Sequence, residues 1–162
     1  MSTVVYITGD RSLPTHAAYE IVRMIIPKIL IQHPEGVRFV TGNEFSGIER
    51  AVRFIIPEPF ITVLNREKTA EGHIDWDKTS EEASKLAEVA VVVHIDPLNS
   101  RVAKSAMKYF EKVELPLEGI MNVAPDTVPA TDGKVELSTD EKSAFENLVS
   151  GLTFDTDEKN PE

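Results

Sequence analysis

Residues 3–8 read Thr-Val-Val-Tyr-Ile-Thr and are followed by Gly9. This stretch is the first indication of the class of fold. Its β-branched and aromatic side chains follow one another without polar alternation, which predicts a strand buried on both faces. Residues 37–41, Val-Arg-Phe-Val-Thr, repeat the pattern and stop at Gly42. The same reasoning predicts further strands at residues 60–64, 90–95 and 119–123.

Helical periodicity fills the intervals between these strands. Residues 14–33 repeat large apolar side chains at helical spacing, and Pro27 within the run predicts a kink or a break in that helix. The other predicted helices cover residues 46–55, 80–88 and 100–112. The expected N-caps of the last two are Thr79 or Ser80, and Asn99 or Ser100.

The alternation of strand and helix predicts an α/β protein with a Rossmann-like, doubly wound fold. Its mostly parallel five-stranded sheet is expected to carry helices on both faces. We assign this domain to residues 1–124. A C-terminal appendage over residues 125–154 is expected to hold a short hairpin, turning at Asp132-Gly133, and a docking helix. Residues 155–162 are predicted to be a disordered acidic tail.

The composition bounds the functions open to the chain. Its 162 residues carry 17 Lys+Arg and 27 Asp+Glu, a formal net charge of −10, whereas nucleic-acid binding requires a positive surface. Residues 131–162 hold 9 acidic and 3 basic side chains, so the main body can still hold a local positive pocket. The absence of cysteine, of a secretory signal and of a membrane-length apolar run makes a cytoplasmic protein the expectation.

Two glycine turns after predicted strands are the best candidates for a ligand site, because open α/β sheets bind ligands beyond the carboxyl ends of their strands. Gly9-Asp10-Arg11 follows the first strand, and residues 42–49, Gly-Asn-Glu-Phe-Ser-Gly-Ile-Glu, follow the second. Glycine lets an anion approach main-chain N–H groups, and a helix N-terminus adds positive potential. The two turns together therefore predict a phosphate cradle, to which Arg11 adds a guanidinium group.

Further side chains near these turns are candidates for a role in the site. Glu49 and Asp96 are the candidate catalytic carboxylates, although Glu49 at a helix start also fits a residue that stabilises the helix dipole. His94 is either a ligand-binding or a structural residue, and Trp76 either stacks on a base or holds its loop to the body. The ligand-binding candidates are Gly9, Asp10, Arg11, Gly42, Asn43, Ser46, Gly47, Glu49 and His94. The other histidines lack metal-ligand spacing, so neither a metal nor a cofactor is predicted.

These turns resemble those of the SLOG superfamily, which includes the YspA-type (DUF2493) proteins, the DprA-like Rossmann domains and the LOG enzymes. Gly9-Asp10-Arg11 is similar to the family's Gly-Ser-Arg turn. Residues 42–49 are similar to its Gly-x-Ala-x-Gly-(Ile/Ala)-Asp turn, with one residue more between the two glycines. The resemblance covers residues 3–96. In place of the catalytic Pro-Gly-Gly-x-Gly-Thr loop of LOG enzymes, the chain has residues 94–99, His-Ile-Asp-Pro-Leu-Asn.

The resemblance implies a Rossmann-like fold, a nucleotide or nucleotide-derived ligand, and assembly into dimers or larger homo-oligomers. It also implies roles for individual residues. Gly9 and Arg11 would contact phosphate or ribose. Gly42, Asn43 and Gly47 would wrap the phosphate, and Glu49 would face the ligand from the start of its helix.

Three functions fit these observations. The leading one is binding of a nucleotide or nucleotide-derived small molecule, for sensing or sequestration. An alternative is an N-glycosidase or phosphoribohydrolase that acts on nucleoside monophosphates, with Glu49 or Asp96 as the acid or base. In a third, the acidic C-terminal segment makes the protein an interaction module that inhibits a basic partner. Neither a membrane nor nucleic acid is an expected partner.

Overall fold

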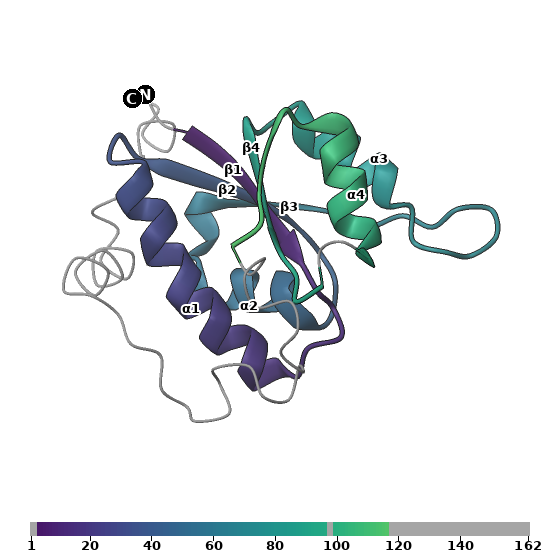
Figure 1. Ribbon diagram of the computed structural model, residues 1–162, viewed down its shortest axis with the longest axis horizontal. Helices are drawn as coiled ribbons and strands as arrows, with labels where there is room; N and C mark the ends of the chain where they lie inside the picture. The colour runs from purple at the N-terminus through teal and green to yellow at the C-terminus, as the bar shows by residue number, and fades with distance from the viewer. Residues whose placement is uncertain (1–2, 97–98, 117–162) are drawn as a thin grey trace.

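Strands and helices alternate along the chain in the computed structural model, which describes residues 3–96 and 99–116 (Figure 1). In chain order the elements are β1 (Thr3–Gly9), α1 (Thr15–Gln32), β2 (Val37–Gly42), α2 (Gly47–Ile55), a 3-10 turn η1 (Glu58–Phe60), β3 (Ile61–Leu64), α3 (Trp76–Ser84), β4 (Val89–Val93), α4 (Arg101–Tyr109) and β5 (Lys112–Glu114).

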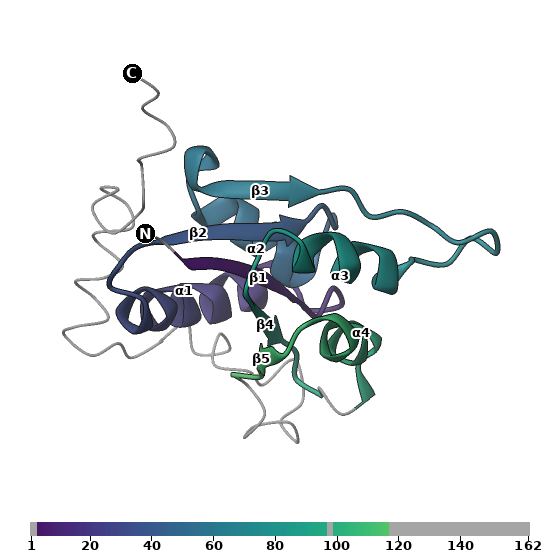
Figure 2. The same ribbon diagram turned by 90° about the horizontal axis from the view of Figure 1, so that it is seen from above.

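The strands form a parallel five-stranded sheet in the order β3-β2-β1-β4-β5, and Figure 2 shows them fanning out in this order. From β1 the chain moves outward through β2 to β3, then returns to β4 on the other side of β1. The strand order therefore reverses between β1 and β4. This topology confirms the predicted doubly wound α/β fold.

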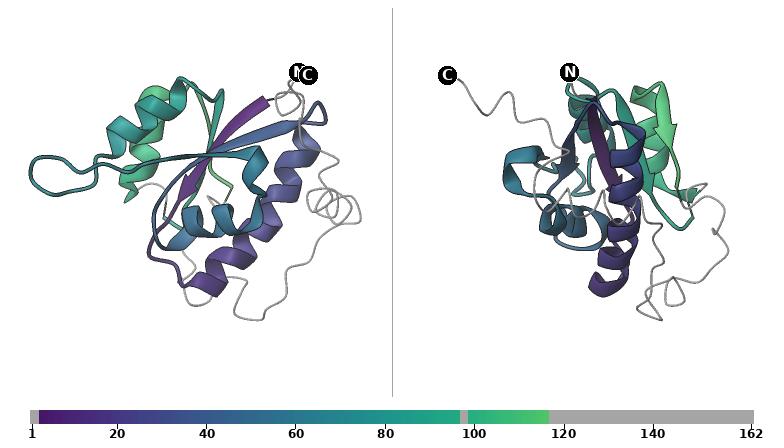
Figure 3. Two further views of the ribbon diagram at one scale, coloured as in Figure 1. Left: turned by 180° about the vertical axis from the view of Figure 1, so that it is seen from behind. Right: turned by 90° about the vertical axis from the view of Figure 1, so that its left-hand side faces the viewer.

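Alternate residues of the three central strands, β2, β1 and β4, face two separate hydrophobic cores. On one face, Val5 and Ile7 of β1 pack with the buried sides of α1 and α2. On the other face, Tyr6 packs with Val92 of β4 and Val102 of α4. The helices consequently lie in two layers, with α1 and α2 on one side of the sheet and α3 and α4 on the other (Figure 3).

Two helices differ from their predicted form. The helix predicted to kink or break at Pro27 is not broken: it is a single element, α1, in which Pro27 itself is buried. The helix predicted over residues 80–88 begins at Trp76 instead. Asp75 is its N-cap, because the Asp75 side chain accepts a hydrogen bond from the N–H of Lys78 at 3.1 Å.

The fifth strand of the sheet, β5, begins where the sequence predicts the end of a helix. Helix α4 ends at Tyr109 because Phe110 turns to an extended conformation and stacks its ring on Tyr6, with 5.7 Å between the ring centroids. The chain then pairs with β4 as β5. At the other end of α4, the predicted N-cap Ser100 is confirmed, since its Oγ accepts a hydrogen bond from the N–H of Ala103. The strand predicted at 119–123 and the appendage and tail over 125–162 lie outside the described residues.

The part of the chain that the structure describes contains no helix with both the length and the apolar character needed to cross a membrane.

Candidate functional site

A cavity of about 390 Å³ lies where the strand order reverses, beyond the carboxyl ends of β1 and β4. Doubly wound sheets bind ligands in this crevice, and small-molecule sites typically measure roughly 300–1,000 Å³. The lining comes from the turn after β1, the loop before α3, the end of β4 and the start of α4. It consists of Gly9, Asp10, Arg11, Ser12, His73, Ile74, Trp76, His94, Ser100, Arg101 and Val102.

Two arginines give this cavity a positive side. The side chain of Arg11 is 56% exposed, with Nη1 3.9 Å from Oε1 of Glu44 and Cζ 5.9 Å from the ring centroid of Trp76. Arg101 is exposed at the N-terminus of α4. Guanidinium groups and a helix N-terminus all favour a bound anion. Trp76 adds an aromatic wall beside them.

The turn after β1 is held from two sides. Its Asp10 N–H donates to the last carbonyl of β4 at 3.0 Å, and the carbonyl of Asp10 accepts from Ile48 N at 2.9 Å. Ser46 Oγ donates to the carbonyl of Arg11 at 2.8 Å. Gly47 has φ +73°, and a Cβ there would overlap the Asp10 carbonyl. Ser46 and Gly47, both predicted to bind ligand, thus position the first turn and do not line the cavity.

The turn after β2 is filled by one of the protein's own side chains. A Cβ at Gly42 would overlap both carboxylate oxygens of Glu49, and the N–H of Glu44 donates to Oε1 of Glu49 at 3.2 Å. The carboxylate occupies the place expected for a phosphate, because the start of α2 attracts a negative group from either source. The predicted two-turn cradle is therefore corrected at Gly42, where Glu49 fills the space expected for a phosphate. The turn after β1 opens onto the cavity, whereas Asn43 and Glu44 of the turn after β2 border a separate cavity of about 290 Å³.

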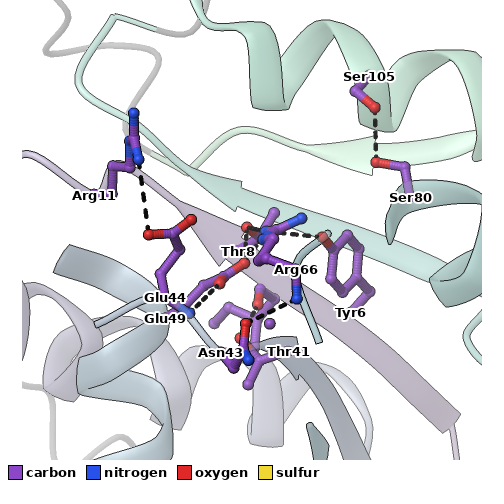
Figure 4. A network of polar contacts seen from close by, with 12 residues as sticks. Tyr6, Thr8, Arg11, Thr41, Asn43, Glu44, Glu49, Arg66, Ser80 and Ser105 are labelled. Atoms are coloured by element: carbon purple, nitrogen blue, oxygen red, sulfur yellow. Dashed lines mark hydrogen bonds and ion pairs between the residues drawn. The ribbon is translucent and has the colours of Figure 1, made fainter. Parts of the chain in front are cut away.

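Glu49 is committed to a buried ion pair with Arg66, and their side chains are 1% and 6% exposed. The Nη2 atom of Arg66 contacts Oε2 of Glu49, Oγ1 of Thr8 at 2.9 Å and the hydroxyl of Tyr6 at 3.3 Å (Figure 4). Thr8 in turn donates to Glu49 at 2.5 Å. The guanidinium carbon of Arg66 lies 4.7 Å from the ring centroid of Trp76. Through Trp76, which also lines the cavity, this cluster is in contact with the cavity wall.

Burial and neighbouring charges shift the pKa values of Arg66 and Tyr6 in this cluster. Burial opposes the charge on Arg66, but the nearby Tyr6 and Glu49 outweigh that effect and raise the pKa of the guanidinium group above its usual value. Burial raises the pKa of the Tyr6 hydroxyl, against the opposing effect of Arg66. Within the described residues, Nε and Nη1 of Arg66 find no hydrogen-bond partner.

Arg66 is not among the residues predicted to bind the ligand. Its one signal is its position, directly after the third predicted strand and thus at the carboxyl edge of the sheet. Asn43 helps to hold it there, since Oδ1 of Asn43 accepts from the N–H of Arg66 at 2.8 Å. Nothing in the local sequence indicates that this arginine turns inward onto Glu49.

The two candidate catalytic carboxylates stand apart from the cavity. Glu49 is enclosed by its ion pair, and Oδ2 of Asp96 accepts from the side chain of Asn99 at 2.8 Å. Neither residue lines the cavity, whereas Asp10 and His94 both do. Among the residues that the structure describes, no group of three His, Cys, Asp or Glu side chains is arranged to hold a metal ion.

Comparison of the chain with protein-family models, with curated proteins and with solved structures finds no match in any of the three. The resemblance to the SLOG superfamily therefore stays a prediction. The observations that bear on function are the doubly wound sheet and the chemistry of its cavity.

Proposed function

We propose that this protein binds a nucleotide or a nucleotide-derived small molecule in the cavity between the ends of β1 and β4. The observation that carries the proposal is the position of this cavity at the reversal of strand order, lined by a glycine turn, two arginines and an aromatic ring. Arg11 and Arg101 suit a phosphate group, and Trp76 suits a base. The cavity's volume of about 390 Å³ suits a ligand of this size.

The proposal extends to the family and to the setting of the protein. A SLOG-type protein with this site would act in the cytoplasm as a homo-oligomer and would sense or sequester its ligand. Binding is favoured over N-glycoside hydrolysis because neither Glu49 nor Asp96 lines the cavity. Size-exclusion chromatography with light scattering tests the oligomeric state independently of the ligand.

Calorimetric titration with AMP, NAD, ADP-ribose and cyclic nucleotides tests the binding proposal. Arg11→Ala should weaken the tightest of these interactions by roughly 1.5–3 kcal/mol, the contribution of a charged hydrogen bond. Arg23→Ala is the matched control, because Arg23 lies in α1 and does not line the cavity. Equal affinities of Arg11→Ala and the unmodified protein would place the ligand elsewhere, and no binding to the whole panel would refute the proposal.

Chromatography of the same nucleotides after incubation with the protein separates binding from hydrolysis. Under the proposal they are recovered intact. Release of a free base together with a ribose phosphate would support the N-glycosidase alternative instead.

A further inference from the structure

Asp10 and His94 face each other across the cavity without touching. Oδ2 of Asp10 lies 3.9 Å from Nε2 of His94, too far for a direct hydrogen bond. Their side chains are 8% and 21% exposed, and both line the cavity. Polar groups with little exposure are usually hydrogen-bonded, so an atom placed between these two side chains would form a hydrogen bond with each of them.

The hydrogen-bonding character of each side chain follows from its other contacts. Oδ1 of Asp10 accepts two hydrogen bonds from Ser12, at 2.8 Å from the N–H and at 2.6 Å from Oγ, so Oδ2 is the oxygen turned to His94. Nδ1 of His94 accepts from the N–H of Asp96 at 3.0 Å. The proton of a neutral His94 is therefore on Nε2. The gap has an acceptor on one side and a donor on the other.

A hydroxyl group fits this gap, because it donates one hydrogen bond and accepts another. A hydroxyl oxygen about 2.8 Å from both Nε2 and Oδ2 completes a triangle with a 3.9 Å base. A water molecule has the same capacity, and a ligand hydroxyl that displaced it would reproduce its bonds. A phosphate oxygen does not fit, because it has no proton to donate to Asp10 and is repelled by that carboxylate.

We infer that Asp10 and His94 recognise a ribose hydroxyl and select ribonucleotides over their deoxy counterparts. This inference rests on the proposed function, since it assigns the sugar position within the same cavity. The phosphate then belongs beside Arg11 and Arg101, and the base beside Trp76. The placement is rigid, because the backbone of Asp10 is hydrogen-bonded to both β4 and α2.

The test compares AMP and ADP-ribose with their 2′-deoxy and 3′-deoxy counterparts by calorimetric titration, with both ribose rings of ADP-ribose modified in turn. A hydrogen bond to a charged group predicts that removal of the recognised hydroxyl weakens binding roughly ten- to a hundredfold. Removal of the other hydroxyl should leave the affinity within about threefold.

Two variants tie the discrimination to the pair. In Asp10→Asn, the two donors of Ser12 require the amide oxygen at the Oδ1 position, so the NH₂ group takes the place of Oδ2 and cannot accept from the hydroxyl. His94→Gln removes the fixed donor. The ratio of ribonucleotide to deoxynucleotide affinity should fall to about one in Asp10→Asn, which loses the charged acceptor, and should fall part of the way in His94→Gln, in which Asp10 still accepts from the hydroxyl. Loss of the Asp10 charge should leave the interaction of the cavity with the nucleotide's phosphate group unchanged or stronger.

The controls are Asp75→Asn, which removes one charge but keeps an N-cap residue, and His33→Gln at the end of α1. Both should keep the discrimination of the unmodified protein. Circular dichroism verifies that every variant is folded, and the affinity ratio is unaffected by any partial loss of active protein.

Each outcome decides between the two proposals. If neither AMP nor ADP-ribose binds, the sugar assignment fails, and the proposed function fails with it when NAD and the cyclic nucleotides do not bind either. If they bind as well as all their deoxy counterparts, the sugar assignment alone is overturned. If discrimination is present but survives Asp10→Asn and His94→Gln, other groups recognise the hydroxyl and the assignment to this pair is wrong.

Discussion

At the scale of single residues, the cluster around Arg66 explains why Gly42, in the second predicted turn, is not open to a ligand. An arginine with a 6% exposed side chain requires a counter-charge, and Glu49 supplies it from the first turn of α2. The same carboxylate fills the turn at Gly42. Because Glu49 is held by both Arg66 and the turn at Gly42, it is not free to act on a ligand, and its role is structural.

Replacing Glu49 by alanine should therefore destabilise the fold. The variant leaves the Arg66 charge buried without its partner, which typically costs about 3–5 kcal/mol. Urea unfolding measures the loss. Glu20→Ala is the matched control, because Glu20 pairs with the partly exposed Arg23 at 3.3 Å and such pairs contribute at most about 1 kcal/mol. Similar losses in the two variants would show that the Glu49–Arg66 pair contributes little.

Tyr6 predicts a loss of stability in alkaline solution. The pKa of its hydroxyl is raised in the folded protein, so the folded state holds this proton to higher pH than the unfolded state. The contribution of the Tyr6 hydroxyl to the free energy of unfolding is complete below the ordinary tyrosine pKa of about 10. It is lost as the pH rises through the pKa of Tyr6 in the folded protein. Unfolding free energies measured between about pH 9 and pH 11 should fall less steeply for Tyr6→Phe. Parallel pH profiles would contradict this.

At the scale of elements, the start of α2 acts as a brace for the turn after β1. Ser46, Gly47 and Ile48 all contact the backbone of Asp10 or Arg11, which determines where these two side chains enter the cavity. The second loop thus contributes to the site by positioning the first turn, although it does not line the cavity.

Gly47→Ala should separate these two loops. The residue has a positive φ, and a Cβ would overlap the Asp10 carbonyl, so we expect a loss of at least about 1–3 kcal/mol together with loss of nucleotide binding. Gly72→Ala is the control, because Gly72 also has a positive φ, of +89°, but a Cβ there meets nothing within 4 Å. That variant should lose some stability and keep its affinity. Unimpaired binding by Gly47→Ala would show that the brace is not needed.

At the scale of the whole molecule, much of the net negative charge and the proposed anion site belong to different parts of the sequence. Residues 131–162 hold 9 acidic and 3 basic side chains of a chain with a net charge of −10. Among the residues that the structure describes, those that line the cavity lie between Gly9 and Val102 and include two arginines. For the proposed ligand we therefore expect the charges that line the cavity to dominate, because repulsion between charges more than about 8 Å apart is screened at physiological salt.

Deletion of residues 131–162 tests this separation. At about 0.15 M salt the nucleotide affinity should change by less than about twofold, while at low salt it should rise because the repulsive charge is removed. Calorimetric titration at two salt concentrations provides the measurement. If the protein is instead an acidic interaction module, the deletion abolishes binding of its basic partner, which a pull-down with the full chain as reference would detect.

Local sequence was sufficient to predict the class of fold. Runs of β-branched residues ending at Gly9 and Gly42 indicate buried parallel strands, since the pattern depends only on neighbours in the chain. Local signals also placed Asp10, Arg11 and His94 at the carboxyl edge of the sheet, and the structure brings these three to one cavity. They were less reliable at element ends, as the start of α3 and the end of α4 show.

Tertiary structure alone determined which of the candidates meet. The Glu49 carboxylate looks the same in the sequence whether it turns toward a ligand or toward Arg66, and only the packing of α2 against the loop after β3 brings it to the arginine. The 3.9 Å gap between Asp10 and His94 likewise depends on the pairing of β1 with β4. Contacts between distant segments are set by the whole sheet, because each depends on the register and packing of elements that the local pattern does not specify.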